Sequence, residues 1–184
     1  MRRSLSVLGV VAVAGIMLAG CLTPGVHLVT PTLMNNTASP ELWHTFGGTN
    51  CYWERLSGTS GAPSEVIANF LSASGPRYVQ IEETDVAFNS RECLPWAQAS
   101  GPFDKRIGQA ADGTFPDGDY RLGNDVEAGD YVASISGSCR WARVSAFTGE
   151  ADAIIEQGTS VTATIDGADF GFQSTGCGVW SKAP

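Results

Sequence analysis

The stretch that decides the fold is Cys51-Tyr52-Trp53-Glu54-Arg55-Leu56-Ser57, which returns at an offset of 88 residues as Cys139-Arg140-Trp141-Ala142-Arg143-Val144-Ser145. Cysteine, tryptophan and arginine recur at every second position in both copies, and this period is typical of a β-strand. The same offset pairs Gly61 with Gly149. A repeat of this length predicts a duplicated structural unit.

A second group of matching residues follows at an offset of 84, so the second copy carries a four-residue deletion between about residues 157 and 161. Surface loops tolerate such changes in length. We therefore predict two tandem modules, residues 38–96 and 113–184, joined by a linker over residues 97–112. The matching pairs are Ile81 with Ile165, Asp85 with Asp169, Phe88 with Phe172, Ser90 with Ser174, Cys93 with Cys177 and Trp96 with Trp180.

Each module predicts an all-β fold. Residues 42–46 and 51–56 flank a Gly-Gly-Thr-Asn turn, and residues 130–136 and 139–145 flank Gly-Ser, which indicates a hairpin in each copy. Further strands are expected at 77–82, 92–96, 159–165 and 177–181, with one at 118–122 in the second module only. Residues 64–70 and 152–157 can each form a single helical turn. The fold class is therefore two sandwich-like or barrel-like modules with few or no helices beyond single turns.

The N-terminus carries a separate signal. Arg2 and Arg3 precede an apolar run that is too short to span a bilayer comfortably, and Leu18-Ala19-Gly20-Cys21 closes the run. This arrangement resembles the lipobox of a bacterial lipoprotein signal peptide. The resemblance implies that residues 1–20 are removed, that Cys21 is lipidated, and that the protein is anchored on the outer face of the cell membrane. Residues 21–37 are interpreted as a flexible spacer.

Five cysteines are present, and lipidation of Cys21 leaves an even set of four. Disulfides persist outside the cytoplasm, and four cysteines allow three connectivities. The repeat favours Cys51 with Cys93 and Cys139 with Cys177, because a duplicated unit should carry its own disulfide. Pairing between the modules stays open.

The charge of the chain argues against nucleic acid as a partner. Removing Arg2 and Arg3 from 11 basic residues leaves nine against 19 acidic ones, and the basic residues are scattered. An acidic surface is repelled by anionic headgroups, so we expect membrane attachment through the acyl chains at Cys21.

No catalytic residue and no cofactor is predicted. Ser60 lies in an incomplete nucleophile elbow, and both His27 and His44 precede it, which rules out the hydrolase order of serine, acid and histidine. Two distant histidines do not predict a zinc site. Residues 112–130 hold six carboxylates that could attract calcium, but they depart from the EF-hand pattern, and we favour a solvated acidic turn region. A glycan hydrolase using Glu54, Glu82 or Glu83 is the main alternative, although the repeat keeps no pair of these acids.

The repeat also sorts the aromatic and charged side chains of the strands. Trp53, Trp96, Trp141 and Trp180 recur at fixed positions, and we expect them to pack in the core near the disulfides. Tyr52 and its counterpart Arg140 lie on the opposite strand face and are candidate surface contacts. Arg55 and Arg143 share the face of the cysteines, so each can pair with Asp85 or Asp169, stack on a tryptophan or reach solvent.

The Cys-Tyr-Trp module with its later Phe-x-Ser-x-x-Cys-x-x-Trp resembles a repeat of exported and lipoprotein-type proteins of actinobacteria, over roughly residues 38–184. The resemblance implies location and architecture and no catalytic residues. We interpret the chain as a membrane-anchored, non-enzymatic interaction unit whose partner is an envelope protein or glycan. A purely structural envelope protein is a further alternative.

Overall fold

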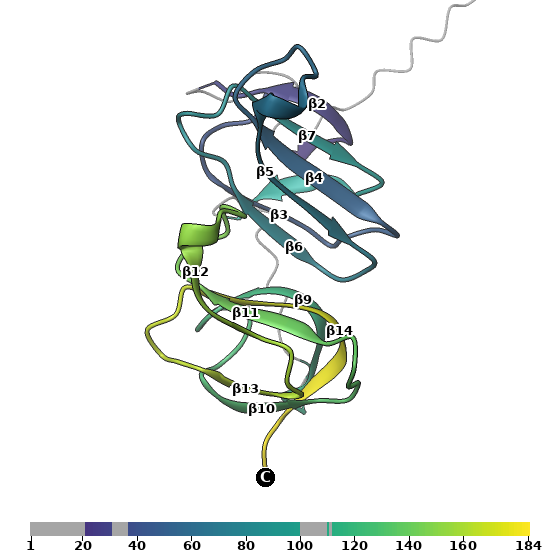
Figure 1. The fold of residues 1–184 in the computed structure, drawn as a ribbon, viewed down its shortest axis with the longest axis vertical. Coiled ribbons are helices and arrows are strands. Elements are labelled where there is room, and N and C mark those ends of the chain that lie inside the picture. Colours follow the sequence, from purple (N-terminus) through teal and green to yellow (C-terminus); the bar gives the residue numbers. More distant parts are fainter. Residues whose placement is uncertain (1–20, 31–36, 100–109, 111) are drawn as a thin grey trace, which may run out of the picture.

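A computed structural model of the chain describes residues 21–30, 37–99, 110 and 112–184. The predicted signal peptide at residues 1–20 therefore lies outside the described residues. The structure has two β modules that follow one another along the long axis of the molecule (Figure 1). The first contains β1 (Cys21–Leu22), β2 (Gly25–Leu28), β3 (Leu42–Thr45), β4 (Cys51–Leu56), β5 (Val66–Ser72), β6 (Arg77–Gln80), β7 (Ala87–Arg91) and β8 (Trp96–Gln98). The second contains β9 (Phe115–Arg121), β10 (Gly129–Ala133), β11 (Arg140–Val144), β12 (Ile154–Gly158), β13 (Thr162–Ile165) and β14 (Gly171–Lys182).

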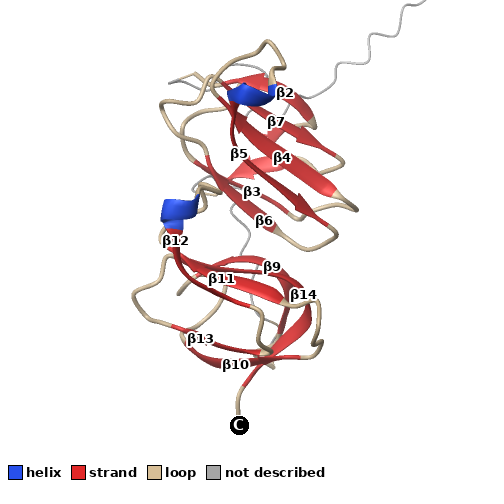
Figure 2. Cartoon of the chain, in the orientation of Figure 1, coloured by secondary structure: helices blue, strands red, loops and turns tan. Residues whose placement is uncertain are grey.

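The all-β fold class is confirmed. Within the described residues the only helical elements are two 3-10 turns, Pro63–Glu65 and Ala151–Ala153 (Figure 2). The helical turns expected at 64–70 and 152–157 are wrong for most of their length, because only the residues up to Glu65 and Ala153 are helical. Val66 and Ile67, like Ile154 and Ile155, are β-branched, and the chain continues there as β5 and β12, which pair with β4 and β11.

The two modules have the same strand order, with two differences in continuity, because β9 corresponds to β1 and β2 together and β14 to β7 and β8 together. The first has two four-stranded sheets, β1-β8-β3-β6 and β2-β7-β4-β5. The second has a single sheet in the order β12-β11-β14-β10-β13, with β9 also paired to β14. The long β14 therefore makes the pairings that β7 and β8 make separately in the first module. In the first module Glu92, with φ 55°, and Pro95, which has no N–H to donate, separate these two strands.

The spacer expected at residues 21–37 is wrong for its described part. Cys21 and Leu22 pair with β8, and β2 pairs with β7 along its whole length. The pairings match those of β9 with β14, so Leu22, Gly25 and His27 are the counterparts of Phe115, Gly118 and Tyr120. The first module thus begins at Cys21, and the strand expected only in the second module occurs in both.

The predicted linker is shorter than expected at its start, because Ala97 and Gln98 belong to β8 and pair with His44 and Trp43. Most of the remaining linker, at 100–109 and 111, lies outside the described residues.

Each module has a buried core beside its own disulfide. Cys51 bonds to Cys93 and Cys139 to Cys177, which confirms the pairing within modules. The expected core role of the tryptophans is also confirmed, since Trp53, Trp96 and Trp180 are almost fully buried and Trp141 is 8% exposed. Burying such rings supplies much of the stability of a small domain.

Candidate functional site

Each of the two inward-facing arginines forms an ion pair with the aspartate of its own module, as one of the sequence alternatives proposed. Arg55 donates from Nε and Nη2 to the two carboxylate oxygens of Asp85, at 2.7 and 2.9 Å. Arg143 makes the same two bonds to Asp169, at 2.7 and 2.8 Å. The hydrogen bonds that Arg143 donates to Asp169 raise the pKa of Arg143. The side-by-side geometry is typical of a strong arginine–carboxylate pair.

Arg55 differs from Arg143 because it also binds the second module. Its Nη1 donates to the carbonyl oxygen of Thr148 and to Glu150 Oε2, both at 2.9 Å. Burial lowers the pKa of Arg55, but Asp85 and Glu150 outweigh this effect and leave the pKa above its ordinary value. Arg143 has only Glu156 of its own module as its further carboxylate partner among the described residues. Arg55 is therefore a contact between the modules as well as an internal pair.

A second buried ion pair crosses between the modules. Arg77 of β6 donates to Asp119 of β9 at 2.7 Å, and both side chains are about 1% exposed. Asp119 also accepts from the Tyr78 backbone N–H at 3.0 Å, and the Tyr78 hydroxyl donates to Asp125 at 2.9 Å. Burial raises the pKa of Asp119, while the Arg77 charge and the Tyr78 N–H oppose the rise. A buried pair of this kind constrains how its two elements sit together.

Aromatic packing joins the same faces. The Tyr78 ring stacks on Phe147 at 5.2 Å between centroids, and Tyr78 belongs to the apolar core of the second module. Gly149 lies directly against Trp53, where an added Cβ would come within 2.6 Å of the ring. The two modules therefore share packed surface as well as ion pairs.

The solvated acidic turn expected at residues 112–130 is wrong for Asp119 and Asp125, which are buried at the contact between the modules. The other carboxylates have separate partners. Asp117 accepts from the backbone N–H groups of Cys177 and Gly178, Asp112 from Thr114, Glu127 from Lys182 and Asp130 from Thr164. Within the described part of the chain, no three His, Cys, Asp or Glu side chains are grouped to hold a metal ion.

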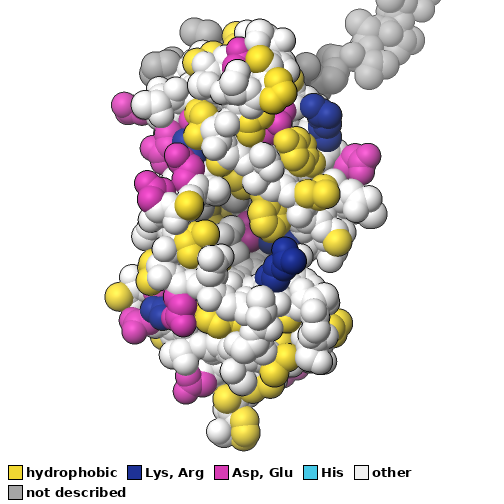
Figure 3. Space-filling view, viewed as in Figure 1, with side chains coloured by type: hydrophobic (Ala, Val, Ile, Leu, Met, Phe, Trp, Pro, Cys, Tyr) yellow, Lys and Arg dark blue, Asp and Glu magenta, His cyan; other side chains and the backbone are white. Residues whose placement is uncertain are grey.

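A groove of about 400 Å³ runs between the modules. The apolar side of its wall includes Phe70, Leu71 and Ile154, of which Leu71 is 63% exposed. Amides from both modules line it as well, and Arg140 and Glu150 add one charge of each sign. Figure 3 shows the surface hollowed between the modules, with apolar side chains and a basic side chain at the rim. The amides are Asn69, Gln157 and Gln173.

The two candidate contact residues therefore have different surroundings. Arg140 is exposed and lines the groove. Tyr52 lies beside the groove, because its cross-strand neighbour on β5 is Leu71, but its hydroxyl donates to Glu54 at 2.6 Å. Burial and this carboxylate raise the pKa of Tyr52 to about 12. The sequence did not single out Leu71 or the amides, because a groove between modules depends on how they dock.

The acids considered for a glycan hydrolase are not brought into the groove. Glu54 lies beside the groove, opposite Asn69 on β5, but does not line it and accepts from Tyr52 and from Asn89. Glu82 and Glu83 lie in the turn that presents Asp85 to Arg55, where the Glu82 backbone N–H donates to Asp85. Glu150 is the only acid that lines the groove among the described residues, and it is paired with Arg55.

Comparison with known families agrees with this architecture. A model of the Rv1352-like extracellular domain family matches residues 25–97 and, a second time, residues 111–181. The chain belongs to this family. The two matches are the two modules, so the Rv1352-like domains of this chain are extracytoplasmic and each carries one disulfide. Neither the curated proteins nor the solved structures gave a match. Among the residues that the structure describes, no helix is long and apolar enough to cross a membrane.

Proposed function

We propose that this protein is lipidated at Cys21, is held on the outer face of the cell membrane, and acts as a non-enzymatic binding protein. Its groove between the two Rv1352-like domains is the binding site. The ligand is a component of the cell envelope, either a protein or a glycan.

The observation that carries this proposal is the composition of the groove, whose walls come from both modules. Asn69, Phe70 and Leu71 belong to the first module, whereas Arg140 and Gln157 belong to the second. Two ion pairs between the modules, of which Arg77 with Asp119 is fully buried, hold these walls in place before a ligand arrives. Concave, preformed sites at domain interfaces that combine apolar surface with a few polar groups are typical binding sites.

The position of Cys21 supports the anchoring. Cys21 is exposed at the first residue of β1, and Leu22 beside it is buried in the first module. Acyl chains on Cys21 would therefore place the first module directly at the membrane surface. Two or more chains give stable attachment, whereas one does not.

Metabolic labelling with a fatty-acid analogue tests the anchoring. The wild-type chain should take up the label and sediment with membranes, whereas Cys21→Ser should lose both properties. If Cys21→Ser keeps both the label and the sedimentation with membranes, Cys21 is not the residue that anchors the protein.

Capture from a native envelope fraction tests the groove. The wild-type chain should retain one defined component, identified by mass spectrometry or by glycan analysis, and the variant with Leu71→Asp and Arg140→Glu should lose it. The matched control combines Leu28→Asp and Arg91→Glu, because both residues are exposed and neither lines the groove. Equal capture by both variants would overturn the assignment of the groove.

A further inference from the structure

The face of the first module that receives the second module has a counterpart in the second module itself. Tyr78 and Gln80 contact Phe147, through ring stacking and a backbone hydrogen bond. Trp53 and Ala68 lie against Gly149. Leu42 and Ala99 pack on the core of the second module. These six residues form the docking face: Leu42, Trp53, Ala68, Tyr78, Gln80 and Ala99.

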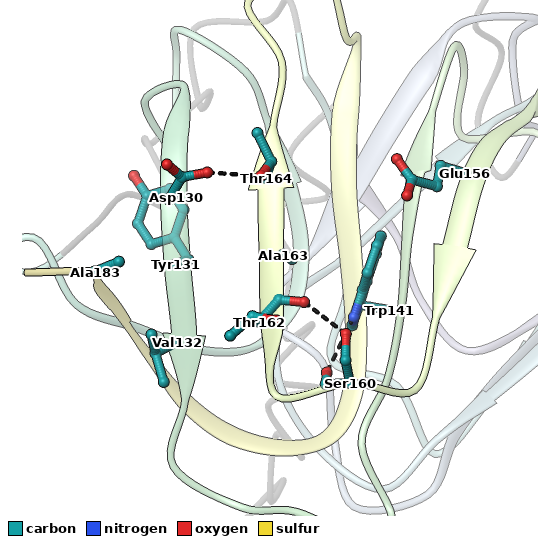
Figure 4. Close-up of a pocket in the computed structure, with 10 residues that line it drawn as sticks. All are labelled: Asp130, Tyr131, Val132, Trp141, Glu156, Ser160, Thr162, Ala163, Thr164 and Ala183. Atoms are coloured by element: carbon teal, nitrogen blue, oxygen red, sulfur yellow. Dashed lines mark hydrogen bonds between the residues drawn. The ribbon is translucent and has the colours of Figure 1, made fainter.

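The strand registers give the equivalent residues of the second module. Leu42 pairs with Gln80 as Asp130 pairs with Thr164, and Ala68 lies opposite Arg55 as Glu156 lies opposite Arg143. The full set of equivalents is Asp130, Trp141, Glu156, Thr162, Thr164 and Ala183. All six line a single hollow of about 550 Å³ (Figure 4). We call these six residues the acidic face.

The chemistry of the acidic face is opposite to that of the docking face. Leu42 and Ala68 are replaced by the carboxylates Asp130 and Glu156. Arg77, which holds Asp119 at the docking face, is replaced by Val161. No Lys or Arg side chain lines the hollow within the described residues. Arg55 and Arg77, beside the docking face, bind carboxylates of the second module, whereas the acidic face itself presents carboxylates and is suited to a cation.

An aromatic ring, that of Trp141, lines the same hollow beside Glu156. Phe70 of the first module is replaced by Gly158, and the Trp141 ring packs so closely on Gly158 that an added Cβ would lie 2.5 Å from it. The indole N–H donates to the Ser160 carbonyl oxygen at 3.1 Å, and the ring stacks on Phe172. Figure 4 shows the ring between Glu156 and the turn at Ser160. Tryptophan is the strongest side-chain partner in cation–π contacts.

Both carboxylates retain capacity to accept further hydrogen bonds. Asp130 Oδ1 accepts from Thr164, and Glu156 Oε2 accepts from Arg143. These bonds use one oxygen of each carboxylate, and the Glu156 side chain is 54% exposed. An ionised carboxylate can accept at both oxygens.

A second copy of this chain is a poor occupant. The second module docks through Asp119, Phe147 and Glu150, and the first module has Val26, Thr59 and Ala62 at the equivalent positions. The first module of another copy therefore lacks the groups that make the contact within the chain.

We propose that the acidic face docks a lysine or arginine side chain presented by a partner protein, with its cationic group against the Trp141 ring and between Asp130 and Glu156. This site is separate from the groove, so a test can contradict one of the two proposed sites and leave the other unaffected.

The test uses the full-length ¹⁵N-labelled chain in a nonionic detergent, titrated with the peptide acetyl-Gly-Ser-Lys-Ser-Gly-amide. The matched control peptide carries norleucine in place of lysine, and spermidine serves as a free amine. The lysine peptide should shift the Trp141 indole N–H and the amides of Thr162 and Thr164. Asp130→Asn combined with Glu156→Gln should weaken its binding at least about fivefold, because charge complementarity is lost. Glu54→Gln on the first module should leave the affinity unchanged.

Equal shifts with the norleucine peptide, or equal affinity for the charge-neutralised variant, would overturn the proposal. Spermidine binding tighter than the lysine peptide would overturn the assignment to a partner protein, since a free amine would then be the ligand. Shifts of the same resonances on concentrating the chain alone would assign the face to a second copy instead.

Discussion

At the scale of single residues, both modules keep the same arginine–aspartate ion pair, but the arginine of the first module has an additional role. Arg55 and Arg143 hold Asp85 and Asp169 in the same geometry, but Arg55 reaches Thr148 and Glu150 in the other module as well. The Arg55 side chain is 1% exposed, whereas that of Arg143 is 16% exposed. Leaving a charged side chain without its partner costs much more stability in a buried site than near solvent.

Arg55→Met should therefore destabilise the chain by about 3–5 kcal/mol, since it leaves Asp85 buried and unpaired. Arg143→Met should cost less, because it leaves Asp169 buried and unpaired as well but breaks no contact with the other module. Urea unfolding of both variants measures the difference. Equal costs would show that the contacts of Arg55 with the second module contribute nothing to stability.

The two glycines Gly61 and Gly149 form a matched pair for the contact between modules. Both have left-handed backbone, with φ of +80° and +77°, so an alanine is strained to the same degree at either position. A Cβ at Gly61 has nothing within 4 Å, whereas a Cβ at Gly149 meets the Trp53 ring.

Gly61→Ala should cost about 1 kcal/mol from backbone strain alone. Gly149→Ala should cost about 1–3 kcal/mol more, which is typical of overpacking. Thermal unfolding of the two variants compares them. A Gly149→Ala protein as stable as Gly61→Ala would show that the packing of Gly149 on Trp53 is loose.

At the scale of elements, the sequence predicted those strands and disulfides that are marked by residues recurring in both copies. The strands that begin at Cys51 and Arg140, the strand that contains Cys177, both disulfides and the core tryptophans follow from residues that recur at a fixed spacing. The strand expected at 92–96 is wrong except at Trp96, where β8 begins. β1 and β2 escaped notice because only their pairing resembles that of β9. His27 takes the place of Tyr120, and each bonds the carbonyl oxygen of the residue four positions earlier. The longer connection after β2 also breaks the common offset, since Val29 bridges Ala38 where Leu122 bridges Val126.

The place of β2 in the first module predicts the effect of His27→Ala. His27 is 1% exposed and donates from Nε2 to the Thr23 carbonyl oxygen at 2.6 Å. The substitution should cost about 1–3 kcal/mol, because it leaves a cavity and a buried acceptor without its donor. Urea unfolding measures this cost. A change within about 0.5 kcal/mol, as expected for a surface residue of a spacer, would contradict the assignment of β2 to the module.

At the scale of the whole molecule, two similar modules dock in one order only. The first offers Arg77, Tyr78 and Arg55, and the second offers Asp119, Phe147 and Glu150. The groove exists only because of this docking, and neither module could supply both of its walls. The sequence showed the two modules but could not show their contact, because its partners lie 42 to 95 residues apart and occur once each. The acidic face is the equivalent surface of the second module, and no further module among the described residues of this chain docks on it.

Residual dipolar couplings of the backbone N–H groups, measured on the full-length ¹⁵N-labelled chain in a weakly aligning medium, test most directly whether the modules form one body. The couplings from residues 21–98 and from residues 114–182 should fit a single alignment tensor of the same magnitude and orientation. Arg77→Met combined with Arg55→Met should separate the two tensors in chains that remain folded. Two different tensors in the wild-type chain would show that the modules move independently, and the groove could not then be a preformed binding site.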